Sequence, residues 1–186
     1  MSRIKVIQEE EAQGRLKEIY DELTQSRGKL AEVHKIQSLR PESIVKHMEL
    51  YMEIMFSKSE LSRARREMIA VVVSTANGCR YCQGHHGSAL NHYWKDDNKV
   101  SQLKKDPTQL NLSKEDLVLC EYANNLTRQP AKAEATDVTQ PLKAVGFSDA
   151  AILDATLVAG YFNFVNRVVL GLGVSLETDE GKGYEY

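Results

Sequence analysis

Residues 62–86 read SRARREMIAVVVSTANGCRYCQGHH, and this stretch decides how we interpret the fold. After a charged first turn the segment becomes apolar on every side, which is typical of a helix that neighbouring helices bury. The valines at 71–73 are also compatible with a short strand, but the length of the run favours a helix. The Asn77-Gly78 pair ends this helix, and a further helix is expected from about Cys79 to Trp94. The Cys79/Cys82 pair therefore lies at a helix N-terminus.

Outward from this stretch, nearly every long segment has helical spacing, and no alternation of apolar and polar residues is long enough for a sheet. An amphipathic helix is expected from about Glu9 to Ser26, ended by Gly28, and another begins at Pro41. Later helices are expected over 113–126, 137–144 and 148–170. We therefore predict an all-α fold: a single multi-helix bundle over residues 1–176, followed by a polar tail over 177–186.

The composition limits the function. A chain of 186 residues is long enough for one hydrophobic core, and its 26 acidic residues nearly balance 24 Lys and Arg. This balance argues against binding to nucleic acid or to an anionic membrane. The N-terminal residues lack the apolar core of a signal peptide, and no later run is expected to span a bilayer. We expect a cytoplasmic protein with neither nucleic acid nor membrane as a partner.

Three cysteines are present, and two of them form a C-x-x-C pair. In a reducing compartment such a pair indicates a metal site or a redox dithiol. Zinc needs four ligands, and all the candidates come from one short helix: Cys79, Cys82, His85 and His92. Zinc is therefore the weaker alternative. The third cysteine, Cys120, is isolated on the apolar stripe of its own helix and is expected to be a buried, unreactive thiol.

Two histidines follow the pair at helical spacing. A thiol attacks only as its thiolate, and a helix N-terminus together with a proton acceptor lowers the pKa of a cysteine. His86 lies four residues after Cys82 and His85 lies three residues after it, so both imidazoles can reach the helix face that carries Cys82. One of the two histidines would be sufficient as a base.

Glu67 lies twelve residues before Cys79, on the preceding helix. A tight turn between the two helices would fold this carboxylate back over the cysteine pair. A carboxylate beside an apolar run needs a partner or a raised pKa. Glu67 is therefore a candidate catalytic residue, and an ion pair with Arg63 or Arg66 is the structural alternative.

The order of these residues resembles a known motif. Glu67, Cys79-Arg80-Tyr81-Cys82 and His86, at their spacing here, resemble the core of the alkylhydroperoxidase D-like branch of the carboxymuconolactone decarboxylase family. The helix at Pro41 and the late stretch over 160–167 also look like the peroxidase-related members of that family. The resemblance covers most of the chain and implies an all-helical fold.

The resemblance implies roles for each of these residues. Cys82 would attack a peroxide and Cys79 would resolve it as a disulfide, without a metal or other cofactor. Glu67 and His86 would form the relay that deprotonates Cys82, with Tyr81 and His85 as candidate supporting residues. The best-known members have a histidine before the second cysteine. Tyr81 is a weaker proton acceptor near neutral pH, so we expect a shorter relay or a different electron donor.

The resemblance also implies partners. Family members typically form homo-trimers or larger rings such as hexamers, and a lipoyl or thioredoxin-like protein reduces them. The Pro41 helix carries a stripe of large side chains: Met48, Tyr51, Met52 and Met55. A single small core would not bury all of them, so the stripe also favours an oligomer. We expect a thiol-dependent hydroperoxide reductase. Two alternatives stay open: a carboxymuconolactone decarboxylase-like lyase, which does not depend on a cysteine pair, and a non-enzymatic dithiol protein that senses oxidation.

Overall fold

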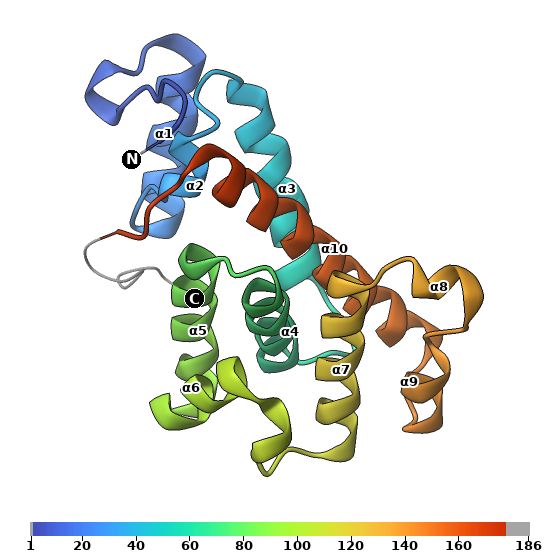
Figure 1. Ribbon diagram of the computed structural model, residues 1–186. Helices are drawn as coiled ribbons and strands as arrows, with labels where there is room; N and C mark the ends of the chain where they lie inside the picture. Colours follow the sequence, from blue (N-terminus) through green and yellow to red (C-terminus); the bar gives the residue numbers. More distant parts are fainter. Residues whose placement is uncertain (1, 178–186) are drawn as a thin grey trace.

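The computed structural model describes residues 2–177, and helices alone make up the regular structure in this range (Figure 1). This confirms the all-α prediction. The α-helices are α1 (Gly14–Arg27), α2 (Glu32–Lys35), α3 (Pro41–Phe56), α4 (Arg63–Ala76), α5 (Arg80–Trp94), α6 (Asp97–Lys105), α7 (Lys114–Arg128), α8 (Lys132–Ala135), α9 (Gln140–Ala144) and α10 (Asp149–Leu172), and the 3-10 helices are η1 (Glu9–Glu11) and η2 (Pro107–Gln109). Of the tail predicted over 177–186, the structure describes only Glu177, which contacts His85 and Tyr81 on α5, and residues 178–186 lie outside the described range. The boundary stays a prediction.

Helix α4 is the centre of the fold. The Ser62 hydroxyl caps its first turn by accepting from the N–H of Arg65, at 3.2 Å. From Arg66 to Ser74 every residue of α4 is buried. Helices α5, α7 and α10 supply this burial, and in Figure 1 α4 lies between α5 and α7 with α10 crossing above. The valines at 71–73 are therefore helical, and the strand alternative was wrong.

A short turn joins α4 to α5. Gly78 adopts a left-handed conformation with φ of +69°, and the next residue, Cys79, is the N-cap of α5. The Asn77 side chain donates to Asn163 at 3.0 Å and to Asn166 at 2.9 Å, so α10 fastens the turn. Two asparagines of the stretch over 160–167 thus fix where the cysteine pair lies.

The N-terminal helices form a second, smaller apolar cluster. Helix α1 ends at Gly28 and α3 begins at Pro41, as predicted. Helix α3 joins the two clusters, because Ile44 is fully buried in the small one and Met55 in the large one. Of the apolar stripe predicted on α3, only Met52 remains exposed, at 41%. The two clusters therefore absorb most of the stripe that favoured an oligomer.

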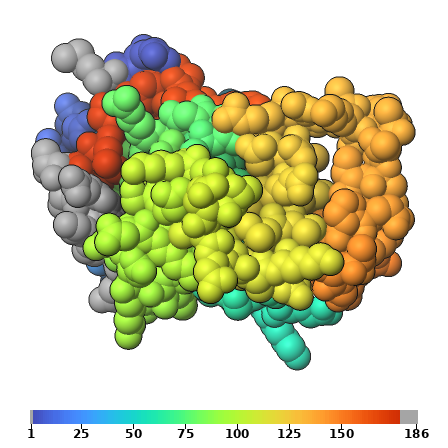
Figure 2. All heavy atoms as spheres, turned by 60° about the horizontal axis from the view of Figure 1, so that its bottom comes forward, coloured from blue at the N-terminus to red at the C-terminus, as the bar shows by residue number. Residues whose placement is uncertain are grey.

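Several element boundaries differ from the sequence-based expectation. Gly14, with φ of +53°, separates a 3-10 turn from α1, so the first helix starts five residues later than expected. Helix α6 was not predicted, because only Val100 and Leu103 of its residues are buried and its apolar stripe is short. The side chain of Asp96 caps it by accepting from the N–H of Lys99 at 3.0 Å. Helix α8 was also missed, and a cavity of about 250 Å³ lies between it, α7 and α9, where Figure 2 shows a hollow.

Helix α10 has the length and the apolar composition of a membrane-crossing helix, so the expectation that no run would qualify was wrong. Core helices of folded domains meet the same criteria, and one face of α10 packs into the large cluster through Val158 and Phe162, both fully buried. Four apolar residues of α10 are exposed: Leu153, Leu157, Phe164 and Leu170. Composition alone therefore does not place α10 in a membrane.

Two glycines provide a test of the turn between α4 and α5. A Cβ at Gly78 would meet no atom within 4 Å, so Gly78→Ala should cost only the strain of the left-handed backbone, about 1–2 kcal/mol of unfolding free energy. Gly160→Ala is the matched control, because Gly160 lies in α10 with equally open space, and it should stabilise the helix by about 0.8–1.0 kcal/mol. Urea unfolding measures both changes, and equal signs for the two variants would contradict the assigned turn.

Candidate active site

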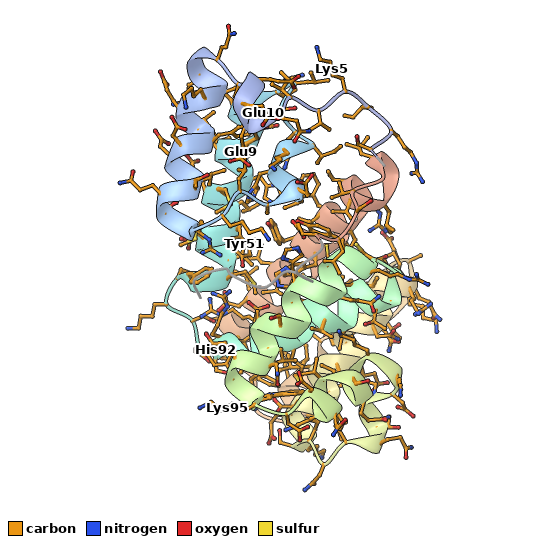
Figure 3. All side chains as sticks on the ribbon, turned by 90° about the vertical axis from the view of Figure 1, so that its left-hand side faces the viewer. Lys5, Glu9, Glu10, Tyr51, His92 and Lys95 are labelled. Carbon is orange, nitrogen blue, oxygen red and sulfur yellow. The ribbon has the colours of Figure 1, made fainter. Side chains whose placement is uncertain are left out.

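A cavity of about 80 Å³ lies between the N-terminal helices, α5 and α10, with room for a few water-sized groups. Its lining is mainly aromatic, with Tyr51, Tyr161 and Phe162 among the wall residues. Cys82 and His86 also line it. In Figure 3, Tyr51 lies where the N-terminal helices meet the rest of the molecule. The cavity therefore brings the predicted attacking thiol and the predicted base to one space.

The two cysteines occupy different positions at the start of α5. Both are buried thiols, but Cys82 lines the cavity, whereas Cys79 is completely covered. A substrate in the cavity would therefore meet Cys82 first, with Cys79 behind it. Cys120 lies in the core on α7, where burial raises the pKa of its thiol to about 12. This placement agrees with the expected unreactive role of Cys120.

The helix N-terminus acts on Cys79 rather than on Cys82. A hydrogen bond from the Cys82 thiol lowers the pKa of Cys79, aided by the backbone N–H groups of Cys82 and Tyr81, although burial opposes this effect. The same hydrogen bond, together with burial, raises the pKa of Cys82 well above its usual range, and a hydrogen bond from Asn166 offsets little of this effect. Cys82 therefore needs a base before it can attack.

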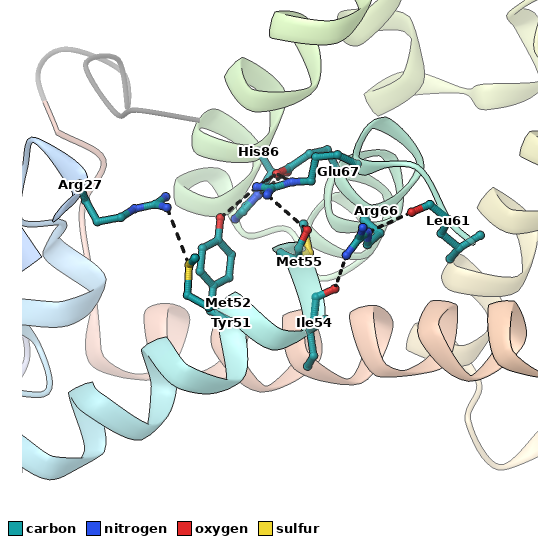
Figure 4. A network of polar contacts seen from close by, with 10 residues as sticks. Arg27, Tyr51, Met52, Ile54, Met55, Leu61, Arg66, Glu67 and His86 are labelled. Carbon is teal, nitrogen blue, oxygen red and sulfur yellow. Dashed lines mark hydrogen bonds and ion pairs between the residues drawn. The ribbon is translucent and has the colours of Figure 1, made fainter. Parts of the chain in front are cut away.

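A buried carboxylate holds the candidate base in place (Figure 4). His86 donates from Nδ1 to Glu67 Oε2 at 2.7 Å, and Arg63 donates from Nε and Nη2 to Glu67 Oε1 at 2.9 and 2.6 Å. The relay partner and the structural partner proposed for Glu67 are thus both present. Arg66 instead donates to backbone carbonyls, including those of Ile54 and Leu61.

The charge of Glu67 follows from these contacts. Burial alone would raise the pKa of this fully buried carboxyl, but His86 and Arg63 outweigh that effect and hold the pKa below its usual value. Glu67 is therefore ionised, and both of its oxygens accept hydrogen bonds. Such a carboxylate is better suited to orient His86 and to stabilise its imidazolium than to take up a proton itself. The Nε2 atom of His86 is then the one available to a thiol.

The two candidate supporting residues belong to a different carboxylate. His85 Nε2 lies 2.7 Å from Glu177 Oε2, and the Tyr81 hydroxyl donates to Glu177 Oε1 at 3.1 Å. Burial alone would raise the pKa of Glu177, but His85 and the backbone N–H groups of Glu177 and Glu32 lower it to about 2. Glu177 lies 92 residues beyond His85, so no local spacing could reveal this pair. His85 and His86 thus have separate partners.

Sequence reasoning missed a second polar group in the cavity. His47 on α3 and Tyr161 on α10 are both buried and meet at 2.6 Å between Nε2 and the hydroxyl oxygen. His47 has helical spacing with the apolar residues Ile44 and Tyr51, so the sequence pattern marks it only as part of a helix face. Its contact with a residue 114 positions later depends on the tertiary fold.

A metal site would need at least three ligand side chains close together. Among residues 2–177, no three His, Cys, Asp or Glu side chains are arranged so that they could hold a metal ion together. The expectation that the site works without a metal or other cofactor stays a prediction.

Comparisons with known proteins show which family the cysteine-pair region resembles. Residues 43–100, which include Glu67, Cys79, Cys82 and His86, match the model of the carboxymuconolactone decarboxylase family. A comparison with curated proteins found no match. The family match and the structural neighbours described next confirm the resemblance inferred from the motif.

Solved structures share the fold over almost the whole chain. A peroxidase-related protein from Silicibacter sp. TM1040 is 26% identical, with a TM-score of 0.83 and 98% of each chain covered. An alkylhydroperoxidase AhpD core protein from Ralstonia eutropha JMP134 is 20% identical, with a TM-score of 0.85 and coverage of 97% of this chain and 94% of that one. The debrominase Bmp8, in complex with 2,3,4-tribromopyrrole, is 19% identical, with a TM-score of 0.78 and coverage of 97% and 96%.

The difference in pKa between the Cys79 and Cys82 thiols can be measured directly. In a Cys82→Ser variant, which keeps a donor beside Cys79, the thiolate absorbance of Cys79 should appear at a pH below the usual range for cysteine. In a Cys79→Ser variant, Cys82 should ionise only above that range, because Cys82 stays buried and its thiol can still donate a hydrogen bond to the serine hydroxyl. A Cys120→Ser background removes the third thiol from the titration. The reverse order of ionisation would contradict the assignment.

Proposed function

We propose that this chain, whose residues 43–100 match the carboxymuconolactone decarboxylase family, is a thiol-dependent hydroperoxide reductase that uses the Cys79/Cys82 dithiol. One observation carries the proposal. The thiol that lines the cavity, Cys82, has a second thiol behind it and shares the cavity with a histidine whose Nδ1 is held by a buried carboxylate. The nucleophile, the resolving thiol and the base are therefore together in one small space.

The reaction that this arrangement supports has two steps. The Cys82 thiol transfers its proton to His86 Nε2, and its sulfur attacks the terminal oxygen of a hydroperoxide. The S–O bond forms as the O–O bond breaks, and the departing alkoxide takes the proton back from the imidazolium, which gives an alcohol. Cys79 then attacks the sulfenic acid on Cys82, which forms the disulfide and releases water. Two thiols are oxidised while one peroxide is reduced.

The proposal includes partners. A lipoyl or thioredoxin-like protein would return two electrons to the disulfide, and the chain would work as a homo-trimer or hexamer in the cytoplasm. The exposed apolar face of α10, which includes Leu153, Leu157 and Phe164, is compatible with an oligomer. These partners follow from the family resemblance.

A second candidate function is the reductive dehalogenation of a small aromatic compound. The rings of Tyr51, Tyr161 and Phe162 in the cavity wall suit a planar substrate. The electrons balance in the same way, because the dithiol would supply two electrons and two protons as carbon–halogen bond cleavage releases a hydrogen halide and forms the disulfide. The lyase and the non-enzymatic dithiol protein remain further alternatives, and neither of them predicts peroxide turnover.

The first test follows the fate of the thiols. Stoichiometric tert-butyl hydroperoxide should convert Cys79 and Cys82 to an intramolecular disulfide and yield one alcohol per disulfide, because the two sulfurs share a hydrogen bond. Cys120 should remain a reduced thiol that is alkylated once the protein is denatured, since its position in the core on α7 shields it from the peroxide. Mass spectrometry of alkylated peptides measures both results, and a halogenated pyrrole in place of the peroxide tests the second candidate. A native disulfide that includes Cys120, or no reaction with either compound, would contradict the proposal.

The second test removes the charge of Glu67. Glu67→Gln should slow peroxide-dependent oxidation of Cys82 by about 100- to 10,000-fold near neutral pH, because His86 loses the carboxylate that orients it and stabilises its charge. Higher pH should restore part of the rate, since hydroxide can then generate the thiolate. The variant should also be less stable, because Arg63 loses its ionised partner. Stopped-flow oxidation below the melting temperature separates rate from stability.

Controls distinguish the relay from general damage. His86→Ala should behave like Glu67→Gln, and the double variant should lose little more than either alone, as expected for groups that act as one unit. His85→Ala should affect the rate less, because Glu177 is its partner. Glu53→Gln, at an exposed position on α3, should leave the rate unchanged. A normal rate in Glu67→Gln, with only a lower melting temperature, would leave Glu67 as a structural partner of Arg63.

A further inference from the structure

A partly buried series of hydrogen bonds leads from α2 to the wall of the cavity. Gln37 donates from Nε2 to the carbonyl oxygen of Val33 at 2.8 Å, and the same nitrogen lies 2.8 Å from His47 Nδ1. The opposite ring nitrogen of His47, Nε2, lies 2.6 Å from the Tyr161 hydroxyl. Three separate parts of the fold thus converge on one phenol in the cavity wall.

The donors and acceptors of this series have one consistent direction. A carbonyl oxygen can only accept, so the amide group of Gln37 that faces Val33 must be its NH2 group. The second hydrogen of that NH2 group points to His47 Nδ1, which therefore accepts. Burial lowers the pKa of His47 to about 4, so at neutral pH the ring is uncharged and its one hydrogen sits on Nε2. His47 therefore donates to the Tyr161 oxygen.

With this direction, the hydrogen bonds from Gln37 through His47 do not use the phenolic hydrogen of Tyr161. The Tyr161 oxygen accepts from His47, and this is the one hydrogen bond that the hydroxyl makes within residues 2–177. Burial raises the pKa of Tyr161 well above its usual range, with Tyr51 and Cys82 acting in the same direction, so the phenol keeps its hydrogen. The Tyr161 hydroxyl is therefore a donor in the cavity that Cys82 and His86 also line.

We propose that Tyr161 is a catalytic residue, whose hydroxyl donates a hydrogen bond to the oxygen that leaves when Cys82 attacks a hydroperoxide. Gln37 and His47 are positioning residues that fix the direction of this donor. The inference rests on the proposed peroxide chemistry. His86 takes the proton of Cys82, Tyr161 stabilises the alkoxide as the O–O bond breaks, and the alkoxide then takes the proton from His86.

The roles of the two sides of the cavity differ for a physical reason. His86 is held by an anion and is suited to accept a proton, whereas Tyr161 receives a hydrogen bond and is suited to donate one. An alkoxide is a poor leaving group, and a fixed donor in a water-poor site stabilises it without reorganisation. The importance of Tyr161 should therefore depend on the leaving group, while that of His86 should depend on the pKa of the thiol.

The test compares two oxidants with different leaving groups. Tyr161→Phe keeps the ring and removes only the donor, so oxidation of Cys82 by tert-butyl hydroperoxide should slow by about 100- to 1,000-fold, which is typical of the loss of one oxyanion donor. Oxidation by peracetic acid, which releases a stable acetate, should slow far less. A purely structural role would slow both reactions alike.

Two further variants support this comparison. Gln37→Leu frees Nδ1 of His47, so that the ring can hold its hydrogen there and accept from Tyr161. It should therefore reproduce part of the selective loss with the hydroperoxide. Tyr122→Phe is the matched control, because it also removes a buried tyrosine hydroxyl, one bonded to Thr156 at 2.7 Å outside the cavity. It should leave both rates unchanged.

The outcomes separate this inference from the proposed function. If the unaltered protein fails to reduce either oxidant, the hydroperoxide reductase proposal fails. If the unaltered protein reacts with both and Tyr161→Phe slows both equally or neither, only the role of Tyr161 is overturned. A loss confined to the hydroperoxide, shared in part by Gln37→Leu, supports Tyr161 as the donor.

Discussion

The buried carboxylate of Glu67 is the constraint on which the site depends. A charge with no exposed surface is stable only when it is paired and hydrogen-bonded, and here Arg63 takes one oxygen and His86 the other. The first contact lies within α4, and the second joins α4 to α5. The charge of one side chain therefore fixes the position of the helix that carries both cysteines and the orientation of the imidazole that faces the cavity.

This arrangement divides the work between two similar thiols. The hydrogen bond from the Cys82 thiol lowers the pKa of Cys79, aided by the backbone N–H groups at the start of α5, and the same hydrogen bond together with burial raises the pKa of Cys82, which lines the cavity. The covered thiol is therefore the one stabilised as a thiolate, and the thiol at the cavity depends on a separate base. The cavity has polar groups on two sides: His86, which is held by an anion, and Tyr161, which is held by a neutral histidine. Aromatic rings form much of the remaining wall and keep the space small.

Much of the fold was predictable because its signals are local. The Pro41 helix, the break at Asn77-Gly78 and a helix that starts near Cys79 depend on neighbouring residues, and all three appear as expected. The pairing of Glu67 with His86 was suggested by a motif, although only the structure shows that Arg63 shares the carboxylate. The contacts of His85 with Glu177 and of His47 with Tyr161 join residues about 90 to 115 positions apart. Nothing in the local sequence encodes them.

The central claim is that Glu67 holds the hydrogen of His86 on Nδ1 and leaves Nε2 for the thiol. Nitrogen NMR of histidine-labelled protein measures this directly, with the His86 signals assigned by their loss in His86→Ala. The account predicts that the neutral ring of His86 carries its hydrogen on Nδ1 and has a bare Nε2, and that this preference is lost in Glu67→Gln. A neutral ring with its hydrogen on Nε2 would contradict the account, because the carboxylate could not then accept from His86 and the nitrogen required as a base would be occupied.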